Sequence, residues 1–252
     1  MESHEIAHIK ELSSAALDKA FLTSSHFLRP EEIDDVKALR LNNVAFIGGH
    51  DNFERGIAIF LPDYMSEEEA IKFESEDNQL IACIQIDVLG GKFAGQLTHR
   101  DLLGAILSLG IKREFVGDIL FDKETAYAFV LTSIVPEIES GLSQAKHEKL
   151  TVKRIPCSDC PAKVDFLKKE LPVSSLRLDL AVASAFHLSR EEAKKTIDGG
   201  LVMVGGLERI EPSTPLKEGM RISLKGHGKF IYLGVAGQSK KGKTIIEIAI
   251  YK

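Results

Sequence analysis

The sequence predicts an α+β protein of three modules, and three observations support this prediction. The middle of the chain shows a strand-helix-strand-strand-helix-strand pattern, a segment with three prolines and two cysteines follows it, and the last part shows two short helices before a series of strands. We therefore expect a helix-rich acidic domain at residues 1–78, a ferredoxin-like domain at 79–155, a connector at 156–173 and a third domain with C-terminal strands at 174–252.

The first module is expected to form two helices, a pair of strands and a third helix. Apolar residues at helical spacing predict helices near residue 6 and over 31–40, the second with Pro30 in its first turn. Apolar runs predict strands at 44–47 and 57–61, and a Ser-Glu-Glu-Glu capping box predicts the helix that follows them.

The second module has the element order of ferredoxin-like (RRM-like) folds. The expected strands are 80–88, 116–121, 125–130 and 151–155, and the expected helices begin after Thr98 and cover 136–146. Gly104 lies inside the first helix, where glycine costs up to ~1 kcal/mol relative to alanine, so we expect a close packing contact there. Tyr127 and Phe129 share one face of a strand, and core packing explains them better than base stacking.

Charge is distributed unevenly along the chain. Residues 1–78 carry 7 Lys and Arg against 17 Asp and Glu, residues 79–172 carry 12 of each, and residues 173–252 carry 13 against 8. A basic module is typical of proteins that bind nucleic acid, because phosphate contacts need Lys and Arg, although an ordinary basic domain would look the same. The acidic first module should repel RNA and is expected to offer a surface to a protein partner.

Composition narrows the class of protein. With 44% hydrophobic and 27% charged residues, the chain is globular and not disordered. No apolar run approaches the ~20 residues of a membrane span, so no membrane partner is expected. Three cysteines do not make a disulfide framework, and the acidic N-terminus lacks the features of a signal peptide, so we expect a cytoplasmic protein.

The third module begins with two amphipathic helices. A serine of the Ser174–Asp179 segment can cap the first helix, with Asp179 in its first turn. Ser189 opens a capping box for the second helix, which carries Arg190 and Lys194 on one face and Lys195 beside them. These like charges repel one another, which suggests that the helix serves an anionic partner, unless neighbouring acids neutralise the face.

Turns and strands follow the two helices. Gly205-Gly206 predicts a tight turn after a short strand. Lys225-Gly226-His227-Gly228-Lys229 forms a glycine-flanked basic loop, which lets backbone amides and ammonium groups approach phosphates closely.

The third module resembles the S4 RNA-binding domain (αL type). The resemblance rests on Ser175-x-Arg177-Leu178-Asp179, on Ser189-Arg190-x-x-Ala193 and on Gly226-x-Gly228. It implies that two helices and the following hairpin dock on structured RNA. The RNA-binding residues that it implies are Ser175, Arg177, Asp179, Ser189, Arg190, Lys194, Lys195, Lys225, His227 and Lys229.

The second module resembles the YlmH family. The matching segments are Leu97-Thr98-His99-Arg100-Asp101, Leu109-Gly110-Ile111-Lys112-Arg113 and Gly117-Asp118-Ile119. The resemblance implies a bacterial, ribosome-associated protein, linked to a division-gene neighbourhood and to quality control of stalled large subunits that carry peptidyl-tRNA. The residues expected to make a second RNA contact are His99, Arg100, Lys112 and Arg113.

The leading prediction is therefore a non-catalytic protein that docks structured rRNA and tRNA on the large ribosomal subunit. No cofactor is expected, because the glycine-rich and catalytic motifs of common enzymes are missing from the sequence. Cys157 and Cys160 have the spacing of half a zinc site but lack a second pair, so no metal is expected. The alternatives are an RNA-modifying enzyme, which a lost rRNA modification would reveal, and an adaptor in cell division, whose association would survive nuclease treatment.

Overall fold

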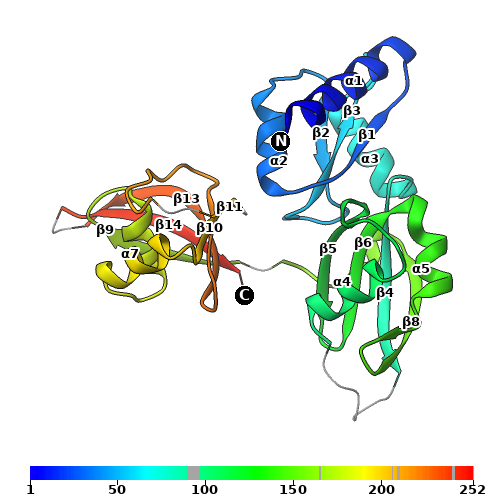
Figure 1. Cartoon of the computed structure of the whole chain (residues 1–252). Helices are drawn as coiled ribbons and strands as arrows, with labels where there is room; N and C mark the ends of the chain where they lie inside the picture. Colours follow the sequence, from blue (N-terminus) through cyan, green and yellow to red (C-terminus); the bar gives the residue numbers. More distant parts are fainter. Residues whose placement is uncertain (90–96, 165, 206, 209–210, 240–241, 252) are drawn as a thin grey trace. The chain divides into compact units, whose positions relative to one another are not determined.

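The computed structural model describes residues 1–89, 97–164, 166–205, 207–208, 211–239 and 242–251, and the chain forms two compact units (Figure 1). Unit 1 is Met1–Val164 and unit 2 is Asp165–Lys252. Helices and antiparallel sheets occur in both units, which confirms the α+β class. None of the described helices is long and apolar enough to span a membrane.

The first part of unit 1 is a three-stranded sheet with helices packed on it. The sheet has the order β1-β3-β2, and its neighbours are antiparallel. Its elements are α1 (Ser3–Lys19), β1 (Thr23–Leu28), α2 (Pro30–Ala38), β2 (Val44–Ile47), β3 (Gly56–Phe60) and α3 (Glu67–Asp77). The predicted helices and strand pair are confirmed, and β1 is an addition that the apolar pattern did not indicate.

The second part of unit 1 is a five-stranded antiparallel sheet of the order β5-β6-β4-β8-β7. Its elements are β4 (Ile81–Leu89), α4 (His99–Leu107), β5 (Val116–Asp122), β6 (Thr125–Leu131), α5 (Val135–Gly141), β7 (Gln144–Ala145) and β8 (Glu148–Ile155). Apart from the short β7, this is the predicted ferredoxin-like topology. The prediction that the second helix reaches residue 146 is wrong, because the chain turns there into the β7–β8 hairpin.

The two faces of this sheet belong to different cores. Ile84, Ile86 and their neighbours pack against α4 and α5 on one face. On the other face, Tyr127 and Phe129 pack with residues of the first sheet, including Phe27. Phe129 is completely buried and Tyr127 is 6% exposed, so core packing is confirmed for both, and neither ring is open to a base.

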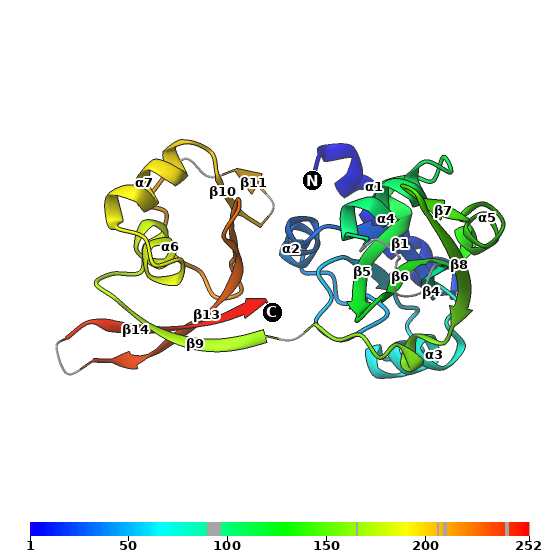
Figure 2. The ribbon, with the colours of Figure 1, turned by 90° about the horizontal axis from the view of Figure 1, so that it is seen from below.

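Unit 2 is a six-stranded sheet with two helices. Its sheet order is β11-β10-β12-β13-β14-β9. Its elements are β9 (Phe166–Val173), α6 (Leu178–Ala185), α7 (Arg190–Asp198), β10 (Val202–Val204), β11 (Leu207–Glu208), β12 (Arg221–Leu224), β13 (Gly228–Gln238) and β14 (Thr244–Tyr251). Both helices lie on the same side of the sheet (Figure 2).

The predicted connector is only partly a connector. Residues 166–173 form β9, which pairs with β14 along its whole length, from Phe166 with Tyr251 to Val173 with Thr244. Residues 166–173 therefore belong to the sheet of unit 2, and the expectation of a connector is wrong for them. This segment forms a strand because Val173 is buried in the core of unit 2 beneath α6 and α7 and Leu171 packs against that core. Most of the polar side chains of β9 stay exposed.

Candidate nucleic-acid interface

Helix α6 begins two or three residues later than a cap at Ser175 or Ser174 would require. Its N-cap residue is Arg177, whose side chain makes no capping hydrogen bond. Instead, the backbone N–H groups of Leu178 and Asp179 donate to the carbonyl oxygens of Thr214 and Pro212. The serine-cap prediction is wrong because this loop already satisfies amides at the start of the helix. Ser175 is exposed just before the helix.

The carboxylate of Asp179 holds two arginines together, and we call Arg177, Asp179 and Arg190 the Asp179 cluster. Nε of Arg177 donates to Oδ1 of Asp179 at 3.0 Å, and its second guanidinium nitrogen Nη2 donates to Oδ2 at 3.1 Å. Nε of Arg190 donates to Oδ2 at 3.4 Å. The cluster therefore joins the start of α6 to the start of α7.

Burial differs sharply within the Asp179 cluster. The side chain of Asp179 is 0% exposed, whereas those of Arg177 and Arg190 are 34% and 57% exposed. The expectation that Asp179 contacts RNA is wrong, because no ligand reaches a carboxylate that is completely covered. Asp179 is a positioning residue, and both guanidinium groups keep part of their surface in solvent.

The charge of Asp179 is maintained by its two partners. Burial alone would raise the pKa of this carboxyl group, because it disfavours the charged form. The hydrogen bonds and positive charges of Arg177 and Arg190 outweigh burial, so the pKa of Asp179 is lowered from its ordinary value. The carboxylate is therefore ionised at neutral pH and holds both arginines in place.

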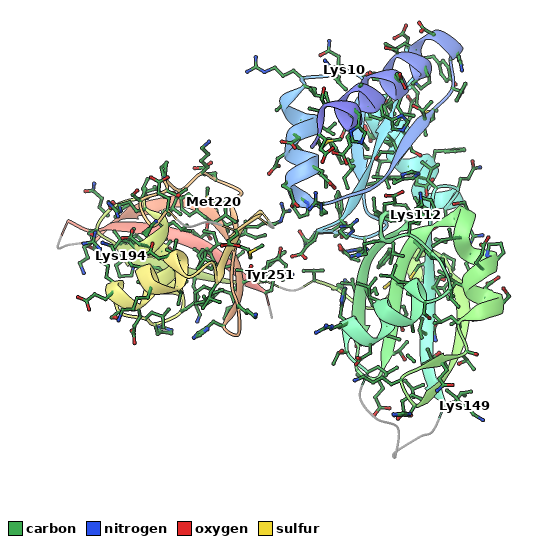
Figure 3. All side chains as sticks on the ribbon, in the orientation of Figure 1. Lys10, Lys112, Lys149, Lys194, Met220 and Tyr251 are labelled. Atoms are coloured by element: carbon green, nitrogen blue, oxygen red, sulfur yellow. The ribbon has the colours of Figure 1, made fainter. Side chains whose placement is uncertain are left out.

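Helix α7 presents the remaining predicted cations of this side. Oγ of Ser189 accepts from the backbone N–H of Glu192 at 3.2 Å, and the Glu192 carboxylate accepts from the N–H of Ser189 at 2.8 Å, which confirms the capping box. Lys194 and Lys195 are exposed on the same helix. Figure 3 labels Lys194, which lies one turn after Arg190.

The basic loop lies at the other ends of the two helices. Lys225, Gly226 and His227 connect Leu224 of β12 to its partner Gly228 of β13, and Lys225 and His227 are exposed. The ring of His227 lies 6.1 Å from that of Phe186, the residue that ends α6. The backbone N–H of Lys225 donates to the carbonyl of Leu201, which follows α7.

Lys229 does not join these residues. Its neighbour Phe230 is in the core beneath the helices, and side chains alternate along a strand, so Lys229 points to the opposite face of the sheet. There its ammonium group lies 4.1 Å from the centroid of the Tyr251 ring. The sequence thus grouped residues that the fold divides between two faces. The predicted tight turn at Gly205-Gly206 is described only in part, because Gly206 lies outside the described residues.

The residues expected to make a second RNA contact fall into two groups. His99 and Arg100 are exposed in the first turn of α4, and Lys112 is exposed before β5. Arg113 is half-buried and donates to the carbonyl oxygens of Val116 and Gly117. Burial lowers its pKa to about 10. Its guanidinium group binds the backbone at the start of β5, so we assign Arg113 a structural role in place of the expected RNA contact.

The three cysteines meet in unit 1, which spacing alone did not indicate. Cys157 and Cys160 pack against the core that contains Cys83 of β4. A hydrogen bond from the Cys83 thiol, with smaller contributions from other neighbours, lowers the pKa of Cys160 to about 7. Burial raises the pKa of Cys157 to about 12. Among the described residues, no group of three His, Cys, Asp or Glu side chains could hold a metal ion.

Two family models match the chain. Residues 74–159 match YlmH_RBD, which describes a proposed RNA-binding domain in YlmH, and residues 176–222 match the S4 domain. The second match contains the Asp179 cluster and the whole of α7. The chain therefore carries RNA-binding domains of two families.

The chain is also similar to two whole proteins. The chain is 32% identical over 205 residues to ribosome-associated protein quality control protein P2 of Bacillus subtilis (strain 168), an alignment that covers 79% of this chain and 75% of the relative. A solved structure, cell division protein ylmH from Streptococcus pneumoniae, matches with a TM-score of 0.47 and 22% identity, over 63% of this chain and 95% of that one. From the family models and the Bacillus relative, the chain belongs to the YlmH family of S4-domain proteins.

Proposed function

We propose that this protein is a non-catalytic RNA-binding protein that docks on structured rRNA and tRNA of the large ribosomal subunit, in the quality control of stalled peptidyl-tRNA complexes. The name of the Bacillus relative supports the ribosomal part of this proposal. The S4 match supports RNA as the ligand of unit 2. We place this activity in the cytoplasm, where ribosomes are found.

The observation that carries the proposal is the Asp179 cluster. One buried carboxylate fixes two guanidinium groups side by side, and both remain partly exposed. A planar guanidinium bonds phosphate oxygens through several N–H groups at once, and a fixed one loses less conformational entropy on binding. Lys194 and the Lys225 loop add cations on the helix-bearing side. Such a surface suits the phosphates and 2′-hydroxyls of folded RNA.

The test is Arg190→Ala in the full chain. We expect the affinity for large ribosomal subunits and for a hairpin of ribosomal RNA to fall by about 10-fold at moderate salt, because one fixed phosphate contact is lost. Arg190 is 57% exposed, and Arg177 still donates two hydrogen bonds to the buried Asp179 carboxylate, so its removal should lower the melting temperature only modestly. Filter binding and thermal unfolding measure the two effects.

Lys10→Ala is the matched control, because it removes the same charge from an exposed position on α1 in unit 1 (Figure 3). Its affinity should stay within twofold of the parent. Equal losses in both variants would mean that net charge and not the Asp179 cluster determines binding, and equal affinity of Arg190→Ala and the parent would refute the proposal.

The acidic N-terminal residues remain candidates for a protein contact. Leu17, Phe21 and Tyr64 are 42%, 49% and 67% exposed, and the Tyr64 hydroxyl donates to the carbonyl of Ala20 near the end of α1. Exposed apolar side chains on an acidic surface suit a protein better than RNA. A partner bound here should remain bound after nuclease treatment.

A further inference from the structure

The sheet of unit 2 carries a second row of side chains on the face opposite α6 and α7. We call Lys229, Tyr251 and Phe166 the Tyr251 row. Tyr251 pairs with Phe166 between β14 and β9, and Ile250 pairs with Phe230, which places Lys229 opposite Tyr251. The row therefore crosses three neighbouring strands, β13, β14 and β9.

The contacts within the row are close. The ring centroids of Tyr251 and Phe166 are 4.9 Å apart, with an interplanar angle of 73°. Nζ of Lys229 lies 4.1 Å from the Tyr251 centroid. Both rings are half-buried and Lys229 is exposed, so solvent reaches all three residues of the row within this unit.

Further cations border the row on the same face. Arg221 of β12 pairs with Ile231, and Lys168 of β9 pairs with Ala249, so both belong to the line of residues next to the row. Lys168 is exposed and forms an ion pair with Glu247 at 3.4 Å. The face thus combines aromatic rings with three basic side chains. Among the described residues of β14 and β9, its acidic side chains are Glu247 and Glu170, which pair with each other.

Aromatic rings beside cations are the elements that bind unpaired nucleotides. A base stacks on an aromatic ring whatever its sequence, and a nearby ammonium group neutralises its phosphate. The stem of Lys229 is flexible, so the ammonium group can leave the ring for a phosphate while a base takes its place. A duplex has no unstacked base to offer, which distinguishes this face from the Asp179 cluster.

We propose that the Tyr251 row binds an unpaired nucleotide of single-stranded RNA, with the base against the Tyr251 and Phe166 rings and the phosphate at Lys229. This inference rests on the proposed RNA binding of unit 2 and adds a second class of RNA on a second face. Unit 2 then holds folded RNA by its helices and a single strand by the back of its sheet.

The test compares two RNA probes on the full-length chain: a ten-nucleotide oligouridine and a ribosomal RNA hairpin. Tyr251→Ala should weaken oligouridine binding by about 10-fold, because one stacked base is lost, and leave hairpin binding within twofold. Tyr251→Phe retains the ring and should bind both probes as the parent does. Lys229→Ala should weaken oligouridine binding and Lys229→Arg should restore it.

A spectroscopic measurement checks stacking directly. The sequence has no tryptophan, so Tyr251→Trp places a single indole in the row. Its fluorescence should be quenched by oligouridine in proportion to binding, and a matched hairpin without unpaired bases should quench it little. This readout does not require that Tyr251→Ala fold.

The outcomes separate this inference from the proposed function. Unchanged oligouridine affinity in a folded Tyr251→Ala, or an indole that oligouridine does not quench, overturns the Tyr251 row as a binding site. Tighter binding of an acidic peptide than of oligouridine to the Tyr251 row overturns this inference as well. In these cases, weaker hairpin binding by Arg190→Ala would still support the proposed function, whereas normal hairpin binding by Arg190→Ala would refute that function alone.

Discussion

A single buried carboxylate explains how unit 2 presents its arginines. Asp179 has no exposed surface, yet it accepts hydrogen bonds from Arg177 and Arg190, and both of these side chains are partly exposed. Removing one partner of such a group leaves charges without compensation, which costs more than the net value of the interaction itself. We therefore expect Asp179 to support stability and, through its two arginines, the proposed RNA binding without touching RNA itself.

Asp179→Asn tests this role. The amide keeps the size of the side chain but loses its charge, so we expect the free energy of unfolding to fall by about 1–3 kcal/mol and RNA affinity to fall as the arginines lose their fixed positions. Urea denaturation measures the first effect. Glu191→Gln, which changes an exposed carboxylate on α7, is the control and should change stability little.

The stability difference between the parent and Asp179→Asn should depend on pH in a definite direction. The pKa of Asp179 is lower when folded than when unfolded, so its stabilising contribution is present above the unfolded value of about 3.9 and is lost as the pH falls through the folded value. The stability difference between parent and Asp179→Asn should be constant from about pH 5 to 8 and shrink below about pH 4. A difference that is largest in acid would contradict the assigned charge state.

At the residue scale, the sequence predicts which side chains are basic but not which face they share. The positions of Arg177 and Arg190 follow from the helix pattern. The burial of Asp179 does not, because an acid in a first helical turn looks the same whether it is solvated or covered. Lys229 was grouped with the wrong face because its direction depends on strand register, which is set by pairing with β12.

At the element scale, the strands with continuous apolar runs were predictable and the others were not. β4 and β6 are buried apolar strands within a residue or two of the predicted limits. β1 begins Thr-Ser-Ser-His and β9 contains two lysines, a glutamate and a proline, so neither shows an apolar run. Both lie at the edge of a sheet, where polar side chains and proline are tolerated.

Gly104 of α4 gives a prediction at this scale. The expected packing contact is missing: apart from Gly104 itself, its chain neighbours and the nearby backbone of α4, no heavy atom of the described residues lies within 4 Å of the place that a Cβ would occupy. Gly104→Ala should therefore raise the free energy of unfolding by up to about 1 kcal/mol, since alanine favours the helix and meets no obstacle. Denaturant unfolding measures this gain, and a loss of stability would indicate a hidden clash.

The covered sheet face of unit 1 also belongs to the element scale. RNA-recognition folds use the face opposite their helices to stack bases, and here Tyr127 and Phe129 of that face are in a shared core with the first sheet. The helical pattern and strand order were predictable from the sequence. The covering was not, because a ring buried by another domain and a ring offered to a base have the same spacing along a strand.

On the scale of the whole molecule, charge is divided between the units. The acidic residues concentrate in the first 78 residues and the excess of basic residues in the last 80. RNA binding by the full chain should therefore be salt-dependent and confined to a few phosphate contacts. With three to four cations engaged, the slope of log affinity against log salt concentration should be about −2 to −4.

Arg190→Ala should make this slope less steep by about one, because one counterion fewer is released. Lys10→Ala should leave the slope unchanged, since α1 is outside the proposed surface. Titrations with the rRNA hairpin at several potassium concentrations give both values. A slope that does not change in Arg190→Ala would mean that this guanidinium does not meet a phosphate.

The pairing of β9 with β14 has a consequence for how the chain is made. β9 is the first strand of unit 2 to leave the ribosome and β14 is the last, so β9 has no pairing partner until β14 has been synthesised. Until β14 emerges, the nascent unit presents an open strand edge and an incomplete core, the state most exposed to misassociation. Pairing between such distant segments also slows folding. Translation that halts before β14 would thus leave unit 2 unfinished.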